Sequence, residues 1–74
     1  MKRMSVKEVE EKIVQIAHEF VQKYGEEVLQ LSYDELISYL TSFFNYEEWL
    51  IFKHNEIEML RLFLKTVKED LSKS

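Results

Sequence analysis

The chain contains no proline and a single glycine, Gly25. Proline and glycine are the residues that most often end helices and form tight turns, so a chain nearly without them has few places where regular structure must stop. Its hydrophobic content of 46% lies in the ordinary range for globular proteins, which argues against global disorder. We therefore expect an all-α fold.

Apolar residues recur with helical spacing over residues 6–24. The string Ser5-Val6-Lys7-Glu8 is typical of a capping box, in which a serine hydroxyl accepts a hydrogen bond from the amide three residues further on. Gly25 is the natural end of this helix. The apolar positions fill an arc of roughly 160° on a helical wheel, which is wide enough to contact two neighbouring helices.

A second capping pattern, Ser32-Tyr33-Asp34-Glu35, predicts a helix over residues 33–44. Residues 26–31 form the connector between it and the first helix, with room for a helical turn. The apolar side chains of this second helix are expected to face the core.

A third cap, Asn45 with Glu48 three residues on, predicts a last helix over residues 46–71. The string Asn55-Glu56-Ile57-Glu58 could cap a new helix, so a break there is left open as the alternative. The expected fold class is a small bundle of three helices, or of four if the break occurs. It forms a single domain over residues 1–74.

The last helix is apolar on two sides, and this predicts self-association. The first two helices cover one side, so we expect a second copy of the chain to cover the other and to form a homodimer through the long C-terminal helix. Oligomerisation also fits the small size, because 74 residues without cysteine bury a small core that no disulfide stabilises. The expected interface residues are Tyr46, Trp49, Phe52, Met59, Leu62 and Phe63.

The middle of the chain is acidic and aromatic. Between Lys23 and Lys53 there is no basic residue, but there are six acidic residues and eight of the ten aromatic ones. Capping accounts for most of the acidity, because Asp34-Glu35 and Glu47-Glu48 fall at predicted helix starts, where the helix dipole favours negative charge.

The aromatic residues divide into two sets with different expected places. Phenylalanines on apolar helix faces are expected in the core. Tyrosine and tryptophan bury a ring and keep a polar atom in water, so at least two of them are expected at an oligomer or partner surface. The core set is Phe20, Phe43, Phe52 and Phe63. The surface set is Tyr33, Tyr39, Tyr46 and Trp49.

No catalytic or cofactor site can be assembled from the sequence. One glycine excludes the glycine-rich phosphate loops of the Rossmann and P-loop motifs, which need close backbone approach. Without cysteine, His18 and His54 are too few for a zinc site. His54 and Glu58 are interpreted as a solvated pair. We expect no enzymatic activity, no metal and no cofactor.

Targeting and membrane segments are not expected either. The start Met1-Lys2-Arg3-Met4 is basic, but the apolar stretch of a signal peptide does not follow it. No apolar run approaches the 18 residues of a membrane span. Together with the lack of cysteine, these features predict a cytoplasmic protein that does not enter the membrane.

The predicted function is a non-enzymatic protein–protein interaction or regulatory module that forms a homodimer and takes a protein partner. The alternative is a helix-turn-helix-like DNA-binding regulator, because residues 31–40, a turn and residues 46–54 have that order. Nucleic acid is the less expected partner. The formal net charge is −4, and phosphates repel the Glu47 and Glu48 that would start the recognition helix.

Overall fold

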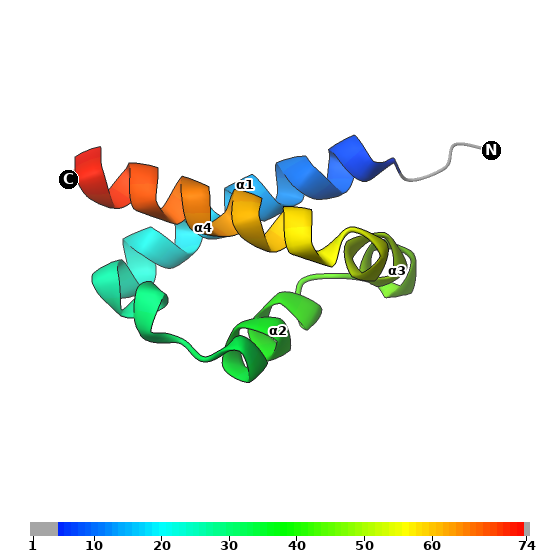
Figure 1. Cartoon of the computed structure of the whole chain (residues 1–74), viewed down its shortest axis with the longest axis horizontal. Helices are drawn as coiled ribbons and strands as arrows, with labels where there is room; N and C mark the ends of the chain where they lie inside the picture. Colours follow the sequence, from blue (N-terminus) through cyan, green and yellow to red (C-terminus); the bar gives the residue numbers. More distant parts are fainter. Residues whose placement is uncertain (1–4, 74) are drawn as a thin grey trace.

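The structure, a computed structural model, describes residues 5–73 and confirms the all-α fold (Figure 1). It takes the four-helix alternative, with a break at Asn55. The basic string Met1–Met4 lies outside the described residues. Within them, four α-helices and one 3₁₀ helix follow one another along the chain: α1 (Val6–Tyr24), η1 (Gly25–Gln30), α2 (Tyr33–Thr41), α3 (Tyr46–His54) and α4 (Glu56–Lys73).

The first helix, α1, begins and ends where the sequence predicted. The Ser5 hydroxyl accepts a hydrogen bond from the Glu8 amide at 3.2 Å. The reciprocal half of the box is altered, because the Glu8 carboxylate contacts the Ser5 hydroxyl and not its backbone amide. Gly25 ends the helix with φ of +60° and ψ of −137°. Backbone of this kind is essentially restricted to glycine, which explains why the one glycine stands here.

Complete capping boxes start α2 and α3 at the predicted positions. At α2, the Glu35 amide donates to the Ser32 hydroxyl at 3.2 Å and the Ser32 amide donates to the Glu35 carboxylate at 3.0 Å. At α3, the Glu48 amide donates to Asn45 Oδ1 at 2.8 Å and the Asn45 amide donates to the Glu48 carboxylate at 2.9 Å. Each box satisfies two amides that a helix start leaves unpaired.

Helix α2 ends at Thr41, three residues before the predicted end of the 33–44 segment. The amides of Ser42, Phe43 and Phe44 bond to carbonyls three residues back, at 3.2, 3.0 and 3.2 Å. Such bonds belong to the tighter 3₁₀ geometry that often closes a helix. The tightened turn therefore replaces the last α-helical turn that hydrophobic periodicity predicted.

Asn55 ends α3 and starts α4. Its side-chain amide donates to the Ile51 carbonyl at 3.0 Å, and its backbone amide donates to the Phe52 carbonyl at 3.1 Å. Its own carbonyl accepts the Met59 amide at 2.9 Å, which is the first backbone bond of α4. Asn55 therefore caps the carbonyl end of α3 through two donors and accepts the first amide bond of α4, so the chain changes direction at this residue.

Helices α1 and α4 form the centre of the fold. They cross each other and run in the same direction, from right to left in Figure 1. His18 Nδ1 of α1 pairs with the Asp70 carboxylate of α4 at the edge of this packing. Every other element contributes side chains to the same core, which consists of Val9, Ile13, Ile16, Ala17, Phe20, Val28, Leu36, Leu40, Phe52, Met59, Phe63 and Val67.

Helix α2 stands furthest from the α1–α4 pair (Figure 1). It reaches the core through two leucines, Leu36 and Leu40, which are both buried. Among the described residues, no helix is long and apolar enough to cross a membrane.

Candidate interaction surface

Three of the six residues predicted at a dimer interface are core residues of the single chain. The exposed fractions of Phe52, Met59 and Phe63 are 0%, 1% and 0%. The break at Asn55 explains their burial, because it lets α4 change direction after α3 and pack along α1. The second apolar side of the last segment is then covered within the single chain. The prediction that these three side chains form an exposed interface is therefore wrong for the folded chain.

The other three predicted interface residues have mixed environments. Trp49 and Leu62 are partly buried against the core. The Trp49 ring stacks on Phe52, with 5.6 Å between ring centroids. Tyr46 is 76% exposed, and Leu50, one turn further along α3, is also exposed. Helix α3 therefore keeps an exposed tyrosine and leucine, but not the continuous apolar face that was predicted.

A different group of rings forms an exposed surface where α1 meets α2. Tyr24, Tyr39 and Phe43 are 38%, 43% and 42% exposed, and we call these three residues the aromatic surface. Each packs edge-on against Phe20, with ring centroids 5.8, 6.0 and 5.9 Å apart. Phe20 is buried and contacts Phe63 of α4 at 5.8 Å. One buried ring thus holds three exposed rings in place on the core.

The sequence predicted only part of this surface. Tyr39 belongs to the set expected at a surface, whereas Phe43 was expected in the core, and that expectation is wrong. The spacing of Phe20 with Tyr24, and of Tyr39 with Phe43, is i,i+4, which predicts that each pair shares one helix face. In the structure Phe43 lies in the tightened turn just after α2. Spacing alone cannot say how completely a neighbouring element covers that face, so the exposure of these rings could not be predicted.

Shallow hollows surround Tyr39, which lines all three of them. The first, of about 380 Å³, is lined by Tyr24, Glu27, Val28, Gln30, Leu31, Glu35 and Tyr39. The second, also of about 380 Å³, is lined by Glu19, Phe20, Lys23, Tyr24, Tyr39, Ser42 and Phe43. The third, of about 590 Å³, is lined by Asp34, Glu35, Ser38, Tyr39 and Ser42. The residues that contribute most to protein interfaces are enriched in tyrosine and lie at such pockets.

The border of the aromatic surface is acidic. The carboxylates that line its hollows come from α1, η1 and α2, namely Glu19, Glu27, Asp34 and Glu35. Lys23 is the one cation that lines these hollows, and its ammonium lies 5.5 Å from the centre of the Tyr24 ring. The Ser32 amide and hydroxyl lower the pKa of Glu35 below its ordinary value, which stabilises the charged carboxylate.

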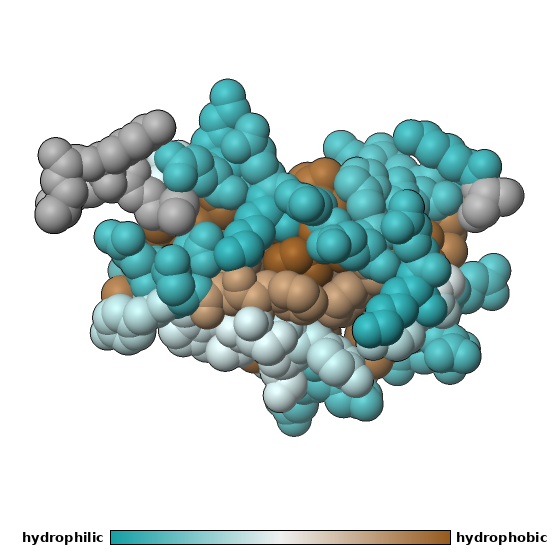
Figure 2. Space-filling view, turned by 180° about the vertical axis from the view of Figure 1, so that it is seen from behind, coloured by the Kyte–Doolittle hydropathy of each residue, from teal (hydrophilic) through white to brown (hydrophobic). Residues whose placement is uncertain are grey.

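Apolar surface is visible on the side of the molecule that Figure 2 shows. A band of brown side chains crosses this face, with strongly hydrophilic side chains along one border and pale, weakly polar ones along the other. Isolated apolar side chains are normal on a protein surface, whereas a band bordered by polar residues is typical of an interaction site.

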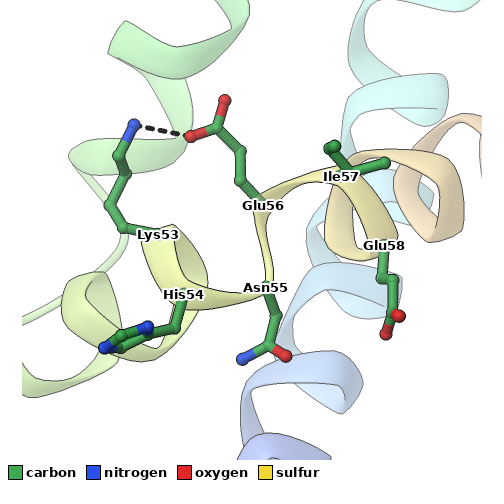
Figure 3. Close-up of a pocket in the computed structure, with 6 residues that line it drawn as sticks. All are labelled: Lys53, His54, Asn55, Glu56, Ile57 and Glu58. Atoms are coloured by element: carbon green, nitrogen blue, oxygen red, sulfur yellow. Dashed lines mark hydrogen bonds and ion pairs between the residues drawn. The ribbon is translucent and has the colours of Figure 1, made fainter.

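A second cluster lies at the corner between α3 and α4 (Figure 3). Lys53 Nζ contacts Glu56 Oε1 at 2.5 Å, and the Tyr33 hydroxyl of α2 donates to the same carboxylate. The Lys53 ammonium also lies 5.6 Å from the centre of the Trp49 ring. The hydrogen bonds from Lys53 and Tyr33 lower the pKa of Glu56, and the bond to Glu56 raises the pKa of Lys53. The cluster ties α2 to the α3–α4 corner.

The same corner does not assemble a metal site. His54 and Glu58 lie on either side of the break, and their side chains do not point toward one another (Figure 3). Within residues 5–73, no three histidine or acidic side chains come together in a group that could hold a metal ion. The corner hollow, of about 450 Å³, is open and lined by Lys53, His54, Asn55, Glu56, Ile57 and Glu58.

Comparison with known proteins adds no assignment: no family model, curated protein or solved structure matches the chain. The site must therefore be judged by its own chemistry. The aromatic surface offers exposed rings, shallow hollows and carboxylates, which suit contact with a cationic and partly apolar surface.

Proposed function

We propose that this chain is a small, non-enzymatic protein–protein interaction module that binds through the aromatic surface. The observation that carries the proposal is the exposure of Tyr24, Tyr39 and Phe43 side by side around Phe20. Aromatic residues are enriched at protein interfaces because they bury a large area at a small cost in conformational entropy. A homodimer, as predicted from the sequence, is one form that such a module takes.

The use of the charged residues supports a non-enzymatic role. Glu48 and Lys12 pair with each other, and Glu48 also caps α3. Lys53 and Glu56 pair with each other, and the Tyr33 hydroxyl donates to Glu56. Such satisfied groups stabilise helices and their contacts. The hydrogen bonds to Glu56 raise the pKa of both Tyr33 and Lys53, which disfavours the deprotonated, nucleophilic form of each. The cytoplasmic location expected from the lack of cysteine stays a prediction.

DNA binding, the alternative raised by the sequence, has less support. Helices α2 and α3 follow each other in the order of a helix-turn-helix. Glu47 is exposed at the start of α3, where phosphates would repel it, and Glu48 is buried and pairs with the partly exposed Lys12. The lysine of α3, Lys53, is already paired with Glu56 and so offers less positive charge to a phosphate.

Site-specific crosslinking tests the proposal. A photoreactive phenylalanine analogue replaces Tyr39 in the full chain, which is expressed in its native cells and irradiated. We expect discrete crosslinked protein species from this position. The control carries the analogue at Glu11, an exposed α1 residue outside the aromatic surface. Equal crosslinking from both positions, or none from Tyr39, would contradict the proposal.

A further inference from the structure

We propose that the aromatic surface of one copy of the chain receives the basic face of α4 from a second copy. We define the basic face of α4 as Arg61, Leu64, Lys65 and Lys68. This inference rests on the proposed function and deepens it by naming the partner as a second copy of the same chain.

The receiving side has carboxylates without partners. Glu19, Glu27 and Asp34 form no ion pair with any residue between positions 5 and 73. They border exposed aromatic rings, and the nearby Lys23 is occupied above the Tyr24 ring. Exposed rings and free carboxylates together attract cations, because ring faces and carboxylates both carry negative potential.

The basic face of α4 has the complementary composition. Its four residues line a shallow hollow of about 420 Å³ together with Glu69. Their i, i+3, i+4 and i+7 spacing places them along one side of the helix. Leu64 is an exposed apolar residue between the cations, and Ile57 continues this side toward the start of α4. The three cations form no ion pair within residues 5–73.

The contact must be made between two copies. The residues by which α4 enters its own core are Met59, Phe63, Thr66 and Val67, and they lie on the opposite side of the helix from the basic face. The basic face therefore points away from the core and cannot reach the aromatic surface of its own chain. A second copy supplies both complementary halves at once.

Charge also decides against two other occupants of the aromatic surface. The phosphates of nucleic acid and the headgroups of an anionic membrane would meet carboxylates of the same sign. A cationic helix face with an aliphatic centre instead finds an opposite charge and an apolar ring at the same place. The charge and the apolar rings of the aromatic surface thus favour a protein partner that carries cations and an aliphatic side chain, as the basic face of α4 does.

Two different patches take part, so the contact is heterologous and each copy carries one of each patch. Such a contact closes into a dimer or ring if the second contact returns to the first copy, and grows into longer assemblies if it does not. Either form gives a mass above the 9.0 kDa of one chain.

Charge reversal at the two patches tests the inference on the full chain. One variant, E19K/E27K, makes the border of the aromatic surface basic. The other, K65E/K68E, makes the face of α4 acidic. All four positions are exposed, so circular dichroism should be unchanged. Matched controls with the same change in net charge are E11K/E47K and K7E/K73E, whose four positions are exposed and line none of the hollows around Tyr39 or on α4.

We expect sedimentation equilibrium to show self-association of the wild-type chain that weakens roughly tenfold when salt rises from about 0.05 M to about 0.5 M. Each charge-reversal variant alone should have a dissociation constant raised by about tenfold or more. An equimolar mixture of the two variants should associate again, because each contact then joins opposite charges. The matched controls should associate as the wild type does.

Three results would overturn the inference: a wild-type chain that stays monomeric, variants that associate as well as the wild type, or a mixture that stays monomeric. The proposed function is tested separately. If the wild-type chain is monomeric but the Tyr39 analogue still crosslinks to another protein, the inference of a second copy is wrong and the interaction module stands.

Discussion

Lys12 of α1 donates hydrogen bonds to both carboxylate oxygens of Glu48, at 2.9 and 3.1 Å. Glu48 is 7% exposed, and the same carboxylate accepts the Asn45 amide that starts α3. The Lys12 ammonium also lies 5.7 Å from the centre of the Phe44 ring. A single buried carboxylate therefore joins the first helix, the α2–α3 turn and the cap of α3.

Removal of the lysine from this pair should destabilise the chain. Lys12→Met leaves the Glu48 carboxylate buried without its cation, and we expect a loss of about 2 kcal/mol in the free energy of unfolding, since Lys12 itself is partly exposed. The double variant Lys12→Met/Glu48→Gln should lose less than Lys12→Met alone, because no charge remains buried. Urea denaturation measures both, and a double variant less stable than the single one would contradict this role of the pair.

The lowered pKa values of three carboxylates predict how the stability of the chain depends on pH. The Ser32 amide and hydroxyl lower the pKa of Glu35, and Lys53 and Tyr33 lower that of Glu56. Burial raises the pKa of Glu48, but the Asn45 amide and Lys12 outweigh it and the net pKa is lowered. Their ordinary pKa is 4.5. A lowered folded-state pKa means that the unfolded chain binds these protons first on acidification.

The stability contributed by these groups is therefore fully present above an unfolded-state pKa of about 4.5 and is lost as the pH falls through the lower folded-state values. Thermal unfolding between about pH 3 and about pH 7 checks this. Glu48→Gln should reduce the acid-dependent loss, whereas Glu11→Gln, at an exposed position with no ion pair to residues 5–73, should leave it as in the wild type. If Glu48→Gln leaves the loss of stability at acidic pH unchanged, Glu48 does not contribute to that loss.

Two phenylalanines distinguish core from surface. Phe63→Ala removes a fully buried ring and should cost about 3–5 kcal/mol, which is enough to unfold much of a chain of this size. Phe43→Ala removes a half-exposed ring and should cost about 1 kcal/mol or less. Circular dichroism with urea denaturation gives both values. A folded, stable Phe63→Ala chain with altered association would instead favour the interface predicted from sequence.

Asn55 provides a test of the break between α3 and α4. Asn55→Ala removes the side-chain hydrogen bond to the Ile51 carbonyl and favours a continuous helix, so we expect a loss of about 1 kcal/mol. A fall of about 4–8 °C in the midpoint of thermal unfolding should accompany it. Glu58→Ala, at an exposed position in the next turn, is the matched control and should change stability by less than about 0.5 kcal/mol. A more stable Asn55→Ala chain would show that the break is not needed.

Helix starts were predictable because their signals are local. The caps at Ser5, Ser32 and Asn45 each depend on residues within three positions, and all three helices begin where those caps predicted. Gly25 ends α1 for an equally local reason, since its backbone conformation disfavours any side chain.

The distribution of apolar side chains between core and surface was not predictable in the same way. Helical spacing identifies an apolar arc but not the element that covers it. Phe52 and Phe63 are core residues because α4 packs along α1, whereas Phe43 packs against Phe20 on one side only and stays half-exposed. The capping string at Asn55 raised the possibility of the break, but the choice between a bent and a straight helix depends on packing that appears only in the folded chain.

The packing of α4 along α1 has a consequence for synthesis of the chain on the ribosome. These two helices lie at opposite ends of the described sequence, and Met59, Phe63 and Val67 of α4 complete the core around Val9 and Ile13 of α1. Contacts between segments so far apart in sequence form later than local ones. The core therefore cannot close while α4 is still inside the ribosomal exit tunnel. Until then, the apolar side of α1 is exposed in the nascent chain, where it is accessible to chaperones.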